Sequence, residues 1–367
     1  MNRDAIIAIA AKFPLHGKLL AALPYGNGHI NDTLVVSFDQ AGTQVRYIFQ
    51  RINHHIFKNV PQLMENISRV TSHLARKVPG GDNRIALTLV PTLAGESFYK
   101  TPEGDCWRVY LFIENARTFD AVENPQQAFK AACAFGQFQQ ALADLPGDRL
   151  HETIPDFHNT PKRFEALRKA AEADVAGRKI EVLAELDFAF QMEFDCGRLL
   201  ELVKTGDIPE RITHNDTKLN NVMIHDNTGE GVCVIDLDTV MPGLSLYDFG
   251  DLVRFATNTA TEDETDLKNV NVSLPVFEAI VKGYIAGAGD ILTDAEWDNL
   301  VFAGKLMTYE VGIRFLTDYL QGDIYFKTKR PGHNLDRARN QLRLVERIEG
   351  ATGAMSAIVS RNRASCM

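Results

Sequence analysis

The sequence lacks the features that would tie it to nucleic acid or to a membrane. Lysine and arginine total 39 against 48 aspartate and glutamate residues, which gives a net charge of −9, and the basic residues form no block. This balance argues against nucleic acid or an anionic membrane surface as the main partner. No apolar stretch approaches the length of a transmembrane helix, and there is no internal repeat or low-complexity tract. We therefore expect neither a nucleic acid nor a membrane as partner.

Cysteine is also scarce. The five cysteines are scattered, odd in number and without C-x-x-C spacing. Such usage fits reduced thiols better than a disulfide framework or a zinc site, so we expect a cytoplasmic protein. The first twelve residues contain a short apolar core like that of a signal peptide, but Asp4 and the following Lys12-Phe13-Pro14 favour an amphipathic first helix instead.

The remaining composition is that of a soluble globular protein, with 45% apolar and 24% charged residues. A chain of 367 residues can bury a large core, and its length favours two domains or lobes. The hydrophobic pattern of residues 1–115 predicts a small α+β lobe, with a helix at 61–76 and strands at 34–38, 45–52, 85–90 and 107–113. Residues 116–367 are predicted to be mostly helical, with helices at 125–142, 161–204 (one or two), 275–286, 294–320 and 333–350. The sequence therefore predicts an α+β protein with a boundary near residue 115.

One segment, residues 211–238, has the spacing of a catalytic centre. His214, Asp216 and Asn221 follow the pattern H-x-D-x-x-x-x-N, and two short apolar strands joined by a turn come next, the second ending at Asp236. This is the layout of a kinase catalytic loop followed by its metal-binding strand. Asp and Asn are also common turn residues, but ordinary residue frequencies give the whole pattern by chance in only about 0.1% of chains of this length.

The residue types suit phosphoryl transfer, which needs phosphate charge neutralised and an acceptor hydroxyl held in line. Asp216 is expected to accept the hydroxyl hydrogen, and Lys218 to reach the transferring phosphoryl group. Asn221 and Asp236 carry the hard oxygen ligands that Mg²⁺ prefers when it bridges nucleotide phosphates. We therefore expect ATP and Mg²⁺ at this segment.

Three neighbouring residues leave alternatives open. Asn220 would replace Asn221 as a metal ligand if the loop slipped by one residue. Asp238 is either a second metal contact or a residue that supports the metal ligands from behind. Asp248 is expected to cap a helix or brace the catalytic loop rather than bind metal.

Several residues are expected at the nucleotide. Gly26-x-Gly28 precedes a strand and is either a phosphate-covering turn, whose backbone N–H groups approach phosphate oxygens, or a plain hairpin turn. Arg51 lies where a kinase strand has its phosphate-pairing lysine and is expected to pair with Glu65 on the following helix, unless it is a solvent-facing arginine. Glu114, at the lobe boundary, is expected to contact the nucleotide.

Two other groups are candidates for the acceptor. The polar residues His29, Asn31 and Asp32 follow the glycine turn and are placed to face an acceptor rather than ATP. Arg314 and Tyr325 flank an unusual helix end, where arginine and tyrosine can hydrogen-bond a polyol or an amide carbonyl. The alternative is a plain helix C-terminus with an arginine near its negative end.

The segments 214–221 and 234–239 resemble the aminoglycoside phosphotransferase and choline kinase superfamily. A closer resemblance, to its N-acetylhexosamine 1-kinase branch, rests on residues 25–33, 49–53, 241–243 and 314–320. The resemblance implies a two-lobed protein-kinase-like fold that moves the γ-phosphate of ATP, with Mg²⁺, to the anomeric hydroxyl of N-acetylglucosamine or N-acetylgalactosamine. By matching positions it implies Asp216 as the base and Asn221 and Asp236 as the metal ligands. It implies that the sugar is held by four residues: His29, Asp32, Arg314 and Tyr325.

Three hypotheses follow from the sequence. The first is a sugar 1-kinase. The second is a kinase of the same fold that acts on an amino alcohol or an aminoglycoside; the acidic stretch 262–266 supports it, and Arg314 counts against it. The third is a non-catalytic nucleotide-binding protein. A protein kinase is disfavoured because there is no A-P-E segment. The preferred hexosamine and the oligomeric state stay open.

Overall fold

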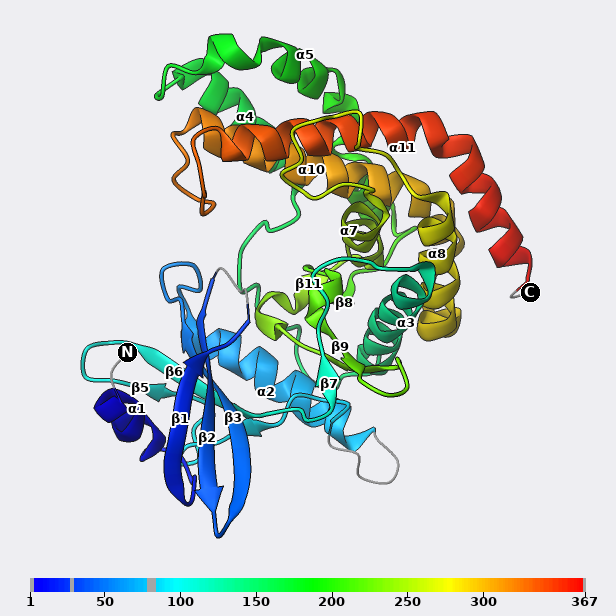
Figure 1. Cartoon of the computed structure of the whole chain (residues 1–367). Helices are drawn as coiled ribbons and strands as arrows, with labels where there is room; N and C mark the ends of the chain where they lie inside the picture. Colours follow the sequence, from blue (N-terminus) through cyan, green and yellow to red (C-terminus); the bar gives the residue numbers. More distant parts are fainter. Residues whose placement is uncertain (1–2, 27–29, 78–83, 366–367) are drawn as a thin grey trace.

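The computed structural model describes residues 3–26, 30–77 and 84–365. It has a β-sheet region formed by the first part of the chain and a helical region formed by the rest (Figure 1). The predicted fold class, a two-lobed α+β architecture of the kinase type, is confirmed. We propose a lobe boundary near residue 115, between the last strand of the large sheet and the first strand of the helical region.

The N-terminal sheet is antiparallel throughout, with strand order β1-β2-β3-β6-β4, and β5 pairs with β6 beside β4. Its strands are β1 (Lys18–Pro24), β2 (Asp32–Gln40), β3 (Thr43–Ile52), β4 (Leu89–Val90), β5 (Tyr99–Lys100) and β6 (Cys106–Leu111). The strand predicted at 85–90 is thus reduced to two residues. Successive side chains of a strand point to opposite faces, so each face of this sheet needs its own cover.

A helix covers each face of the sheet. On one face α1 (Arg3–Ala10) buries Ile6 and Ile9 against Phe49 of β3, which confirms a first helix with one apolar side. On the other face α2 (Val60–Arg76) buries Leu63 and Ile67 completely. Asn59 caps α2 by accepting from the Gln62 backbone N–H, and Pro61 occupies its first turn, where a missing N–H costs nothing.

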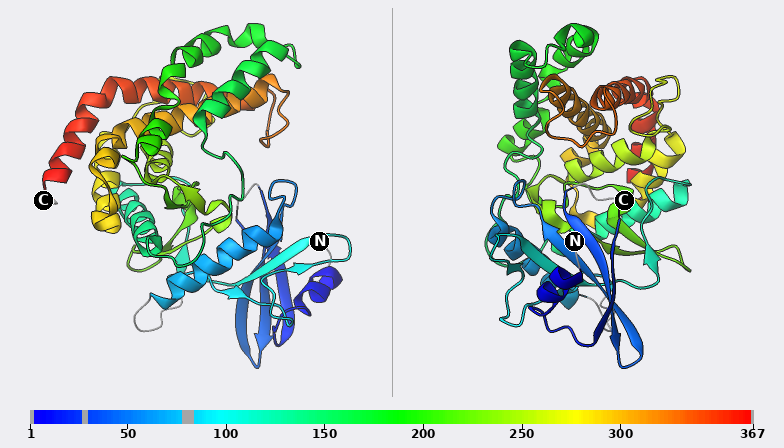
Figure 2. Two further views of the ribbon diagram at one scale, coloured as in Figure 1. Left: turned by 180° about the vertical axis from the view of Figure 1, so that it is seen from behind. Right: turned by 60° about the vertical axis from the view of Figure 1, so that its left-hand side comes forward.

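The C-terminal region is built around tightly packed helices. They are α3 (Pro125–Leu142), α4 (Thr160–Ala173), α5 (Leu183–Gln191), α6 (Arg198–Thr205), α7 (Ser245–Thr257), α8 (Leu274–Ala288), α9 (Asp294–Asp298), α10 (Leu300–Leu320) and α11 (His333–Ala364). Helices α3 and α8 approach so closely that a Cβ on Gly287 would lie 2.1 Å from the carbonyl oxygen of Cys133. Glycine is therefore required for this contact. Figure 2 shows α4 and α5 at the end of the molecule away from the sheet.

Three short strand pairs lie between the large sheet and the helices. Strand β8 (Arg211–Thr213) pairs with β11 (Met241–Gly243), and β9 (Val222–His225) pairs with β10 (Gly231–Val234) and with β7 (Ala116–Arg117). The hairpin predicted after the H-x-D motif is therefore present. The region predicted as one or two long helices at 161–204 is instead broken, because Asp174 ends α4 in a left-handed conformation.

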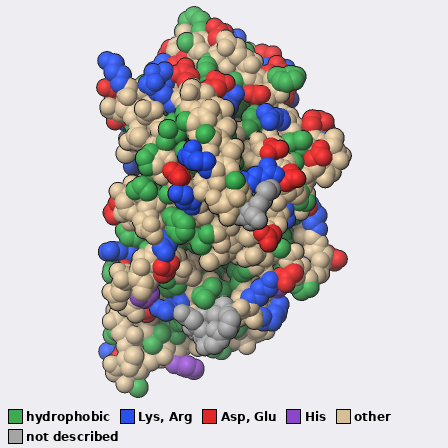
Figure 3. All heavy atoms as spheres, turned by 90° about the vertical axis from the view of Figure 1, so that its right-hand side faces the viewer, with side chains coloured by type: hydrophobic (Ala, Val, Ile, Leu, Met, Phe, Trp, Pro, Cys, Tyr) green, Lys and Arg blue, Asp and Glu red, His purple; other side chains and the backbone are tan. Residues whose placement is uncertain are grey.

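No helix within the described ranges is long and apolar enough to cross a membrane. On the face seen in Figure 3, lysine and arginine side chains are interspersed with aspartate and glutamate rather than gathered into one patch.

Candidate active site

The predicted catalytic loop between β8 and β9 is held by one buried carboxylate of helix α7. Asp248 in the first turn of α7 accepts hydrogen bonds from the backbone N–H groups of His214, at 2.9 Å, and Asn215, at 2.7 Å. The Thr217 hydroxyl donates to the Asp248 carbonyl oxygen. Asn215 has a positive φ of 64°, a conformation that these contacts stabilise. Of the two roles expected for Asp248, the structure supports the brace.

His214 links the catalytic loop to the strand that follows it. Its Nε2 lies 2.8 Å from the carbonyl oxygen of Ile235, and its Nδ1 lies 3.3 Å from the backbone nitrogen of Asp216. Because a carbonyl can only accept, Nε2 carries the proton and Nδ1 accepts. The Phe135 and Phe138 rings pack edge-on against the imidazole. The loop and the end of the predicted metal strand are therefore both held by the His214 side chain.

The structure brings together Asp216, Lys218 and Asn221. Lys218 Nζ lies 2.9 Å from Asp216 Oδ1, and Asn221 Nδ2 donates to Asp216 Oδ2 at 3.1 Å and to its carbonyl oxygen at 2.8 Å. Burial tends to raise the pKa of Asp216, but the ammonium of Lys218 outweighs it and lowers that pKa. The Asp216 carboxylate in turn raises the pKa of Lys218. Both groups are therefore charged at neutral pH.

Asp236 lies next to this group because the hairpin brings its two ends together. The Ile235 backbone N–H donates to the Asn221 carbonyl oxygen at 2.9 Å, and Asp236 then adopts a positive φ of 59°. The Asp236 side chain keeps access to solvent. Desolvation of the carboxyl group by the surrounding protein, together with the negative charges of Asp238 and Asp216, raises the pKa of Asp236 to about 6. An uncompensated carboxylate of this kind is stabilised by a cation.

The donor set fits a magnesium ion that is held partly by a nucleotide. The Asp236 carboxylate receives no hydrogen bond or ion pair from any described side chain or backbone group, and Asn221 lies beside it. In the described part of the chain no three histidine, cysteine or acidic side chains form a ready metal cluster. Mg²⁺ is commonly bound by one or two protein ligands together with substrate phosphates. These two oxygen-bearing side chains match that pattern.

Asp238 has other partners. Its Oδ1 accepts from Arg108 Nη1 of β6, and its Oδ2 accepts from Asn31 Nδ2, which precedes β2. Arg108 and Asp238 are both buried. Of the two roles left open for Asp238, a supporting residue fits these contacts better than a metal ligand. It joins the sheet to the catalytic segment.

The expected ion pair between Arg51 and Glu65 is wrong. Arg51 lies directly opposite Asp32 in the register of β2 and β3, and its Nε donates to Asp32 Oδ2 at 2.9 Å. A longer contact of 3.4 Å joins Arg51 to Asp105. Glu65 lies 2.9 Å from His151 Nε2 instead. The side chain of Arg51 is 44% exposed, so the alternative of a solvent-facing arginine holds.

The alternation of β3 explains this outcome. Phe49, two residues before Arg51, packs on the α1 face, whereas Ile52 packs with α2. Arg51 therefore points to the α1 face, and Glu65 lies on α2 across the sheet.

The cation on the α2 face is Arg108, which the sequence reasoning missed. Its Nε donates to Gln50 Oε1 at 3.0 Å, and its Nη1 contacts Asp238 and, at 3.9 Å, Met64 Sδ of α2. Burial works against its charge, but Asp238 and other neighbours raise the pKa of Arg108 above its ordinary value. An arginine inside the apolar strand Cys106–Leu111 was the available clue, because arginine is almost never fully buried without a partner.

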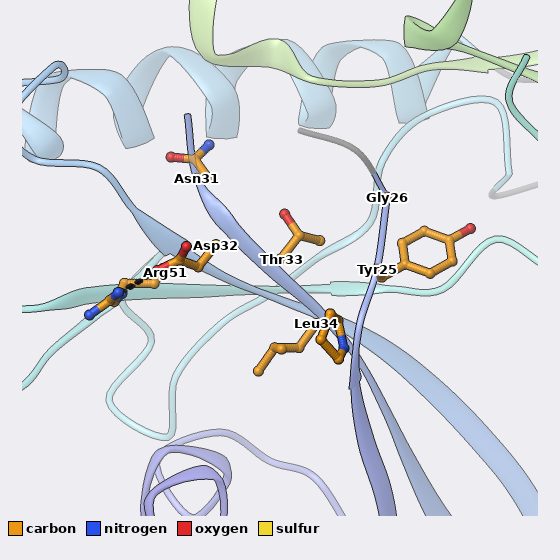
Figure 4. Close-up of a pocket in the computed structure, with 8 residues that line it drawn as sticks. Tyr25, Gly26, Asn31, Asp32, Thr33, Leu34 and Arg51 are labelled. Carbon is orange, nitrogen blue, oxygen red and sulfur yellow. Dashed lines mark hydrogen bonds and ion pairs between the residues drawn. The ribbon is translucent and has the colours of Figure 1, made fainter. Parts of the chain in front are cut away.

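The glycine turn borders a pocket of about 610 Å³ on the sheet. Figure 4 shows Tyr25 and Gly26 on one side of this pocket and Asn31 and Asp32 on the neighbouring strand, with Asp32 bonded to Arg51. Gly26 has a positive φ of 75°, which favours glycine.

Gly28, His29 and Glu114 are the next residues expected at the nucleotide or the sugar. Gly28 and His29 lie outside the described residues. Glu114 pairs with Arg46, whose Nε donates to Glu114 Oε1 at 2.9 Å, and both side chains are exposed. Its contact with a nucleotide stays a prediction.

Arg314 of α10 and Tyr325, which follows that helix, both lie near the Phe326 ring. The guanidinium of Arg314 lies 5.2 Å from the ring centroid of Phe157 and 5.7 Å from that of Phe326, and Tyr325 packs edge-on against Phe326. Arg163 stands close by: burial and then the charge of Arg314 lower the pKa of Arg163. Arg163 and Arg314 are therefore within electrostatic reach of each other, and the Arg314 guanidinium lies among aromatic rings. Arg163 was not expected from the sequence, since nothing in its helix distinguishes it from a surface arginine.

A buried relay connects this arginine pair to the catalytic loop. Glu310, one turn before Arg314 on α10, lies 2.8 Å from His158 Nδ1, and the other ring nitrogen of His158 lies 2.9 Å from the carbonyl oxygen of Asn215. The Thr160 hydroxyl also donates to Glu310. The arginine pair is therefore held at a fixed place relative to Asp216.

The fold is similar to those of solved small-molecule kinases. An aminoglycoside phosphotransferase from Alicyclobacillus acidocaldarius matches with a TM-score of 0.61 and 14% identity, over 98% of this chain and 96% of that chain. A choline kinase from Cryptosporidium parvum matches with a TM-score of 0.58 and 14% identity, over 96% of this chain and 97% of that chain. The ADP-bound aminoglycoside phosphotransferase APH(2'')-Ib matches with a TM-score of 0.53 and 11% identity, over 95% and 99%.

This fold, with a braced H-x-D loop and a hairpin that ends in an aspartate, is of the kinase-like class. The model of the phosphotransferase enzyme family matches residues 21–290. The chain belongs to this family, and the protein is a small-molecule kinase.

Proposed function

We propose that the protein transfers the γ-phosphate of ATP to the anomeric C1 hydroxyl of an N-acetylhexosamine, N-acetylglucosamine or N-acetylgalactosamine. The observation that carries this proposal is the Asp216 carboxylate held between Lys218 and Asn221, with the uncompensated Asp236 beside them. The similar fold of an ADP-bound phosphotransferase supports ATP as the phosphate donor.

In the proposed reaction the C1 hydroxyl oxygen attacks the γ-phosphorus while its proton passes to Asp216. The bond between the γ-phosphorus and the bridging oxygen breaks, and ADP leaves. Lys218 contacts the oxygens of the transferring group and offsets their charge. Asn221 and Asp236 would hold a Mg²⁺ ion, which supplies positive charge against the nucleotide phosphates. An anomeric hydroxyl is more acidic than an ordinary alcohol, so positioning contributes more than base strength.

The charges around the acceptor side support a neutral sugar over a cation. Arg163 and Arg314 are within electrostatic reach of each other there, and two arginines repel a cationic acceptor but can donate to hydroxyls and to an amide carbonyl. A choline or aminoglycoside site calls for free carboxylates or an aromatic cage. The carboxylates nearby have partners: Glu310 binds His158, and Glu262 binds Arg254.

The acidic stretch that the sequence offered in favour of a cationic acceptor is likewise engaged. Glu262 lies 3.1 Å from Arg254 and 3.7 Å from Arg337, and Asp263 lies 3.2 Å from His333. We therefore propose Arg314 and Tyr325 as sugar contacts, with Arg163 added. For His29 and Asp32 the role of sugar contact stays a prediction.

On the nucleotide side we propose that the turn beginning at Gly26 covers the phosphates with its backbone N–H groups. Arg51 and Glu65 have ionic partners of their own, so we leave them out of the nucleotide site. A cytoplasmic location is also proposed, supported by four described cysteines that are free thiols.

ADP release with a panel of acceptors tests this function. The protein is incubated with ATP and Mg²⁺ and, separately, with N-acetylglucosamine, N-acetylgalactosamine, glucose, choline, ethanolamine and kanamycin. We expect the highest kcat/KM with an N-acetylhexosamine. Turnover of only the cationic acceptors would establish the alternative, a kinase for an amino alcohol or aminoglycoside, which the similar folds equally allow. Tight ATP binding without ADP release across the panel would mark a non-catalytic nucleotide-binding protein.

A further inference from the structure

Helix α7 carries a polar stripe that continues past the residue that braces the catalytic loop. Asp248, Asp251 and Arg254 follow at intervals of three residues, so they lie along one side of the helix. All three are buried, with Asp251 and Arg254 each 3% exposed. The first of them holds the loop backbone. The other two have no part in the function proposed above.

Asp251 is only half satisfied. Its Oδ1 accepts from Arg254 Nε at 2.7 Å, whereas its Oδ2 is buried and has no hydrogen-bond donor. Among the described residues it is the one buried carboxylate oxygen in this condition. A buried acceptor without a partner is costly and asks for an explanation. The ion pair with Arg254 does not explain the free Oδ2, because only Oδ1 contacts Arg254.

The charges around Asp251 alternate in sign toward the reacting centre. Asp216 forms an ion pair with Lys218. The carboxylate of Asp251 also raises the pKa of Lys218, by less than that of Asp216 does. The charge of Arg254 in turn lowers the pKa of Asp216. Arg254 is joined at its far side to Glu262, at 3.1 Å. Asp251 is thus the second carboxylate within electrostatic reach of the Lys218 ammonium.

The resting contacts of Asp216 create a need for such a group. Without substrate, Asp216 Oδ1 is paired with Lys218 and Oδ2 with Asn221. A hydroxyl that is to give its proton to Asp216 must take one of these places. If Lys218, whose side chain is 37% exposed, leaves Oδ1, a second carboxylate within reach keeps its ammonium inside the site rather than in solvent. The flexible lysine side chain allows such a move.

We propose that Asp251 is a positioning residue for Lys218: its free Oδ2 receives the Lys218 ammonium when the acceptor hydroxyl takes the lysine's place on Asp216. Lys218 is then held beside the transferring phosphoryl group rather than on the base. This inference rests on the proposed phosphoryl transfer, but it does not depend on which acceptor hydroxyl is used.

A double-mutant cycle between Asp251 and Lys218 tests the inference on the full-length protein. We expect Asp251→Asn to lower kcat by about 10-fold to 100-fold, with the KM values of ATP and acceptor changed by less than about threefold. Lys218→Ala should lower kcat by about 10²-fold to 10³-fold. Because Asp251 acts through Lys218, the double variant should match Lys218→Ala within about twofold. Effects that multiply in the double variant would overturn the inference and leave Asp251 a structural residue.

Glu296→Gln provides a matched control. Glu296 is also fully buried and paired with an arginine, Arg211, at 2.8 Å, but nothing places it near Lys218. Its substitution should lower the melting temperature, and its effect on kcat should multiply with that of Lys218→Ala. If Asp251→Asn does not fold, the same cycle is measured in an Arg254→Gln background, where no unpaired cation remains.

The proposed sugar acceptor and the proposed role of Asp251 can be contradicted independently of each other. If the wild-type protein turns over choline or kanamycin instead of a sugar, the sugar assignment fails, and the cycle is measured with that acceptor. If sugars are phosphorylated but the effects of Asp251→Asn and Lys218→Ala multiply, only the role of Asp251 is overturned.

Discussion

Arg108 of the N-terminal sheet and Asp238 of the catalytic segment form an ion pair that is buried on both sides. Their side chains are 1% and 4% exposed, and 130 residues of chain separate them. Asn31, which precedes β2, donates to the other oxygen of the same carboxylate. The position of the sheet relative to the predicted metal strand therefore depends on one charged contact with little access to water.

Breaking this pair should be far more costly than breaking a surface pair. We predict that Arg108→Met lowers the free energy of unfolding by about 3–5 kcal/mol, because it leaves the Asp238 charge buried and unpaired. Arg46→Met is the control: it removes an ion pair with Glu114 whose side chains are 37% and 49% exposed, which should cost about 0–1 kcal/mol. Urea unfolding followed by circular dichroism measures both. Equal losses for the two variants would contradict the role assigned to Arg108.

Asp216 should be needed for the chemical step. Asp216→Asn keeps the shape of the side chain but removes the proton acceptor, so we predict a fall in kcat of about 10²-fold to 10⁴-fold. Asp226→Asn, in the exposed turn of the neighbouring hairpin, should leave kcat unchanged. Initial rates of ADP release measure the two variants side by side. Near-normal turnover of Asp216→Asn would remove this residue from the role of base.

Asp236 should determine the magnesium requirement. We predict that Asp236→Asn raises the Mg²⁺ concentration for half-maximal activity by at least about tenfold, since loss of a ligand or of its support weakens metal affinity by that order. Removal of Mg²⁺ with a chelator should stop turnover of the wild-type protein, and added Mg²⁺ should restore it. An unchanged Mg²⁺ titration in Asp236→Asn would show that the metal is bound elsewhere.

Glu310 should make stability depend on pH in acid. Burial tends to raise its pKa, but His158 outweighs burial and lowers it. A carboxyl whose pKa is lower in the folded state stabilises the protein fully above its unfolded pKa, here 4.5, and this contribution is lost as the pH falls through the folded pKa. The stability advantage of the wild type over Glu310→Gln should therefore shrink between pH 7 and pH 3.5 in urea unfolding. An advantage that is constant or grows in acid would contradict the assigned pair.

Arg314 should act on acceptor binding rather than on ATP. We predict that Arg314→Ala raises the KM of the N-acetylhexosamine by about 10-fold to 100-fold, the cost of losing hydrogen bonds from a charged donor, and leaves the KM of ATP within about twofold. Arg117→Ala, an exposed arginine whose partner Asp226 lies on the hairpin turn, is the control. Equal increases of both KM values would point to a structural role for Arg314.

The proximity of the residues in segment 211–238 could be predicted because their spacing is local in sequence. The spacing from His214 to Asn221 fixes a loop, and a tight hairpin returns the chain to Asp236, so the relevant residues meet without information from distant elements. The division into a sheet region and a helical region was visible for a similar reason, since hydrophobic periodicity is a property of each segment alone.

Residues whose roles depend on strand faces and register could not be predicted in the same way. The sequence placed a cation on β3 at Arg51, but the alternation of that strand turns Arg51 away from α2. The buried cation comes from β6 instead, at Arg108, which lies opposite Gln50 only because of the β3–β6 register. The same holds for Asp251, whose free oxygen is a fact of packing and leaves no trace in residue spacing.

The most direct test of the function is the position of the transferred phosphate. The protein is incubated with ATP, Mg²⁺ and N-acetylglucosamine or N-acetylgalactosamine, and the product is examined by phosphorus NMR. We predict a sugar phosphate whose phosphorus couples to the anomeric proton, together with an equal amount of ADP. A phosphate on any other hydroxyl, or no sugar phosphate while choline or kanamycin is phosphorylated, would contradict an N-acetylhexosamine 1-kinase.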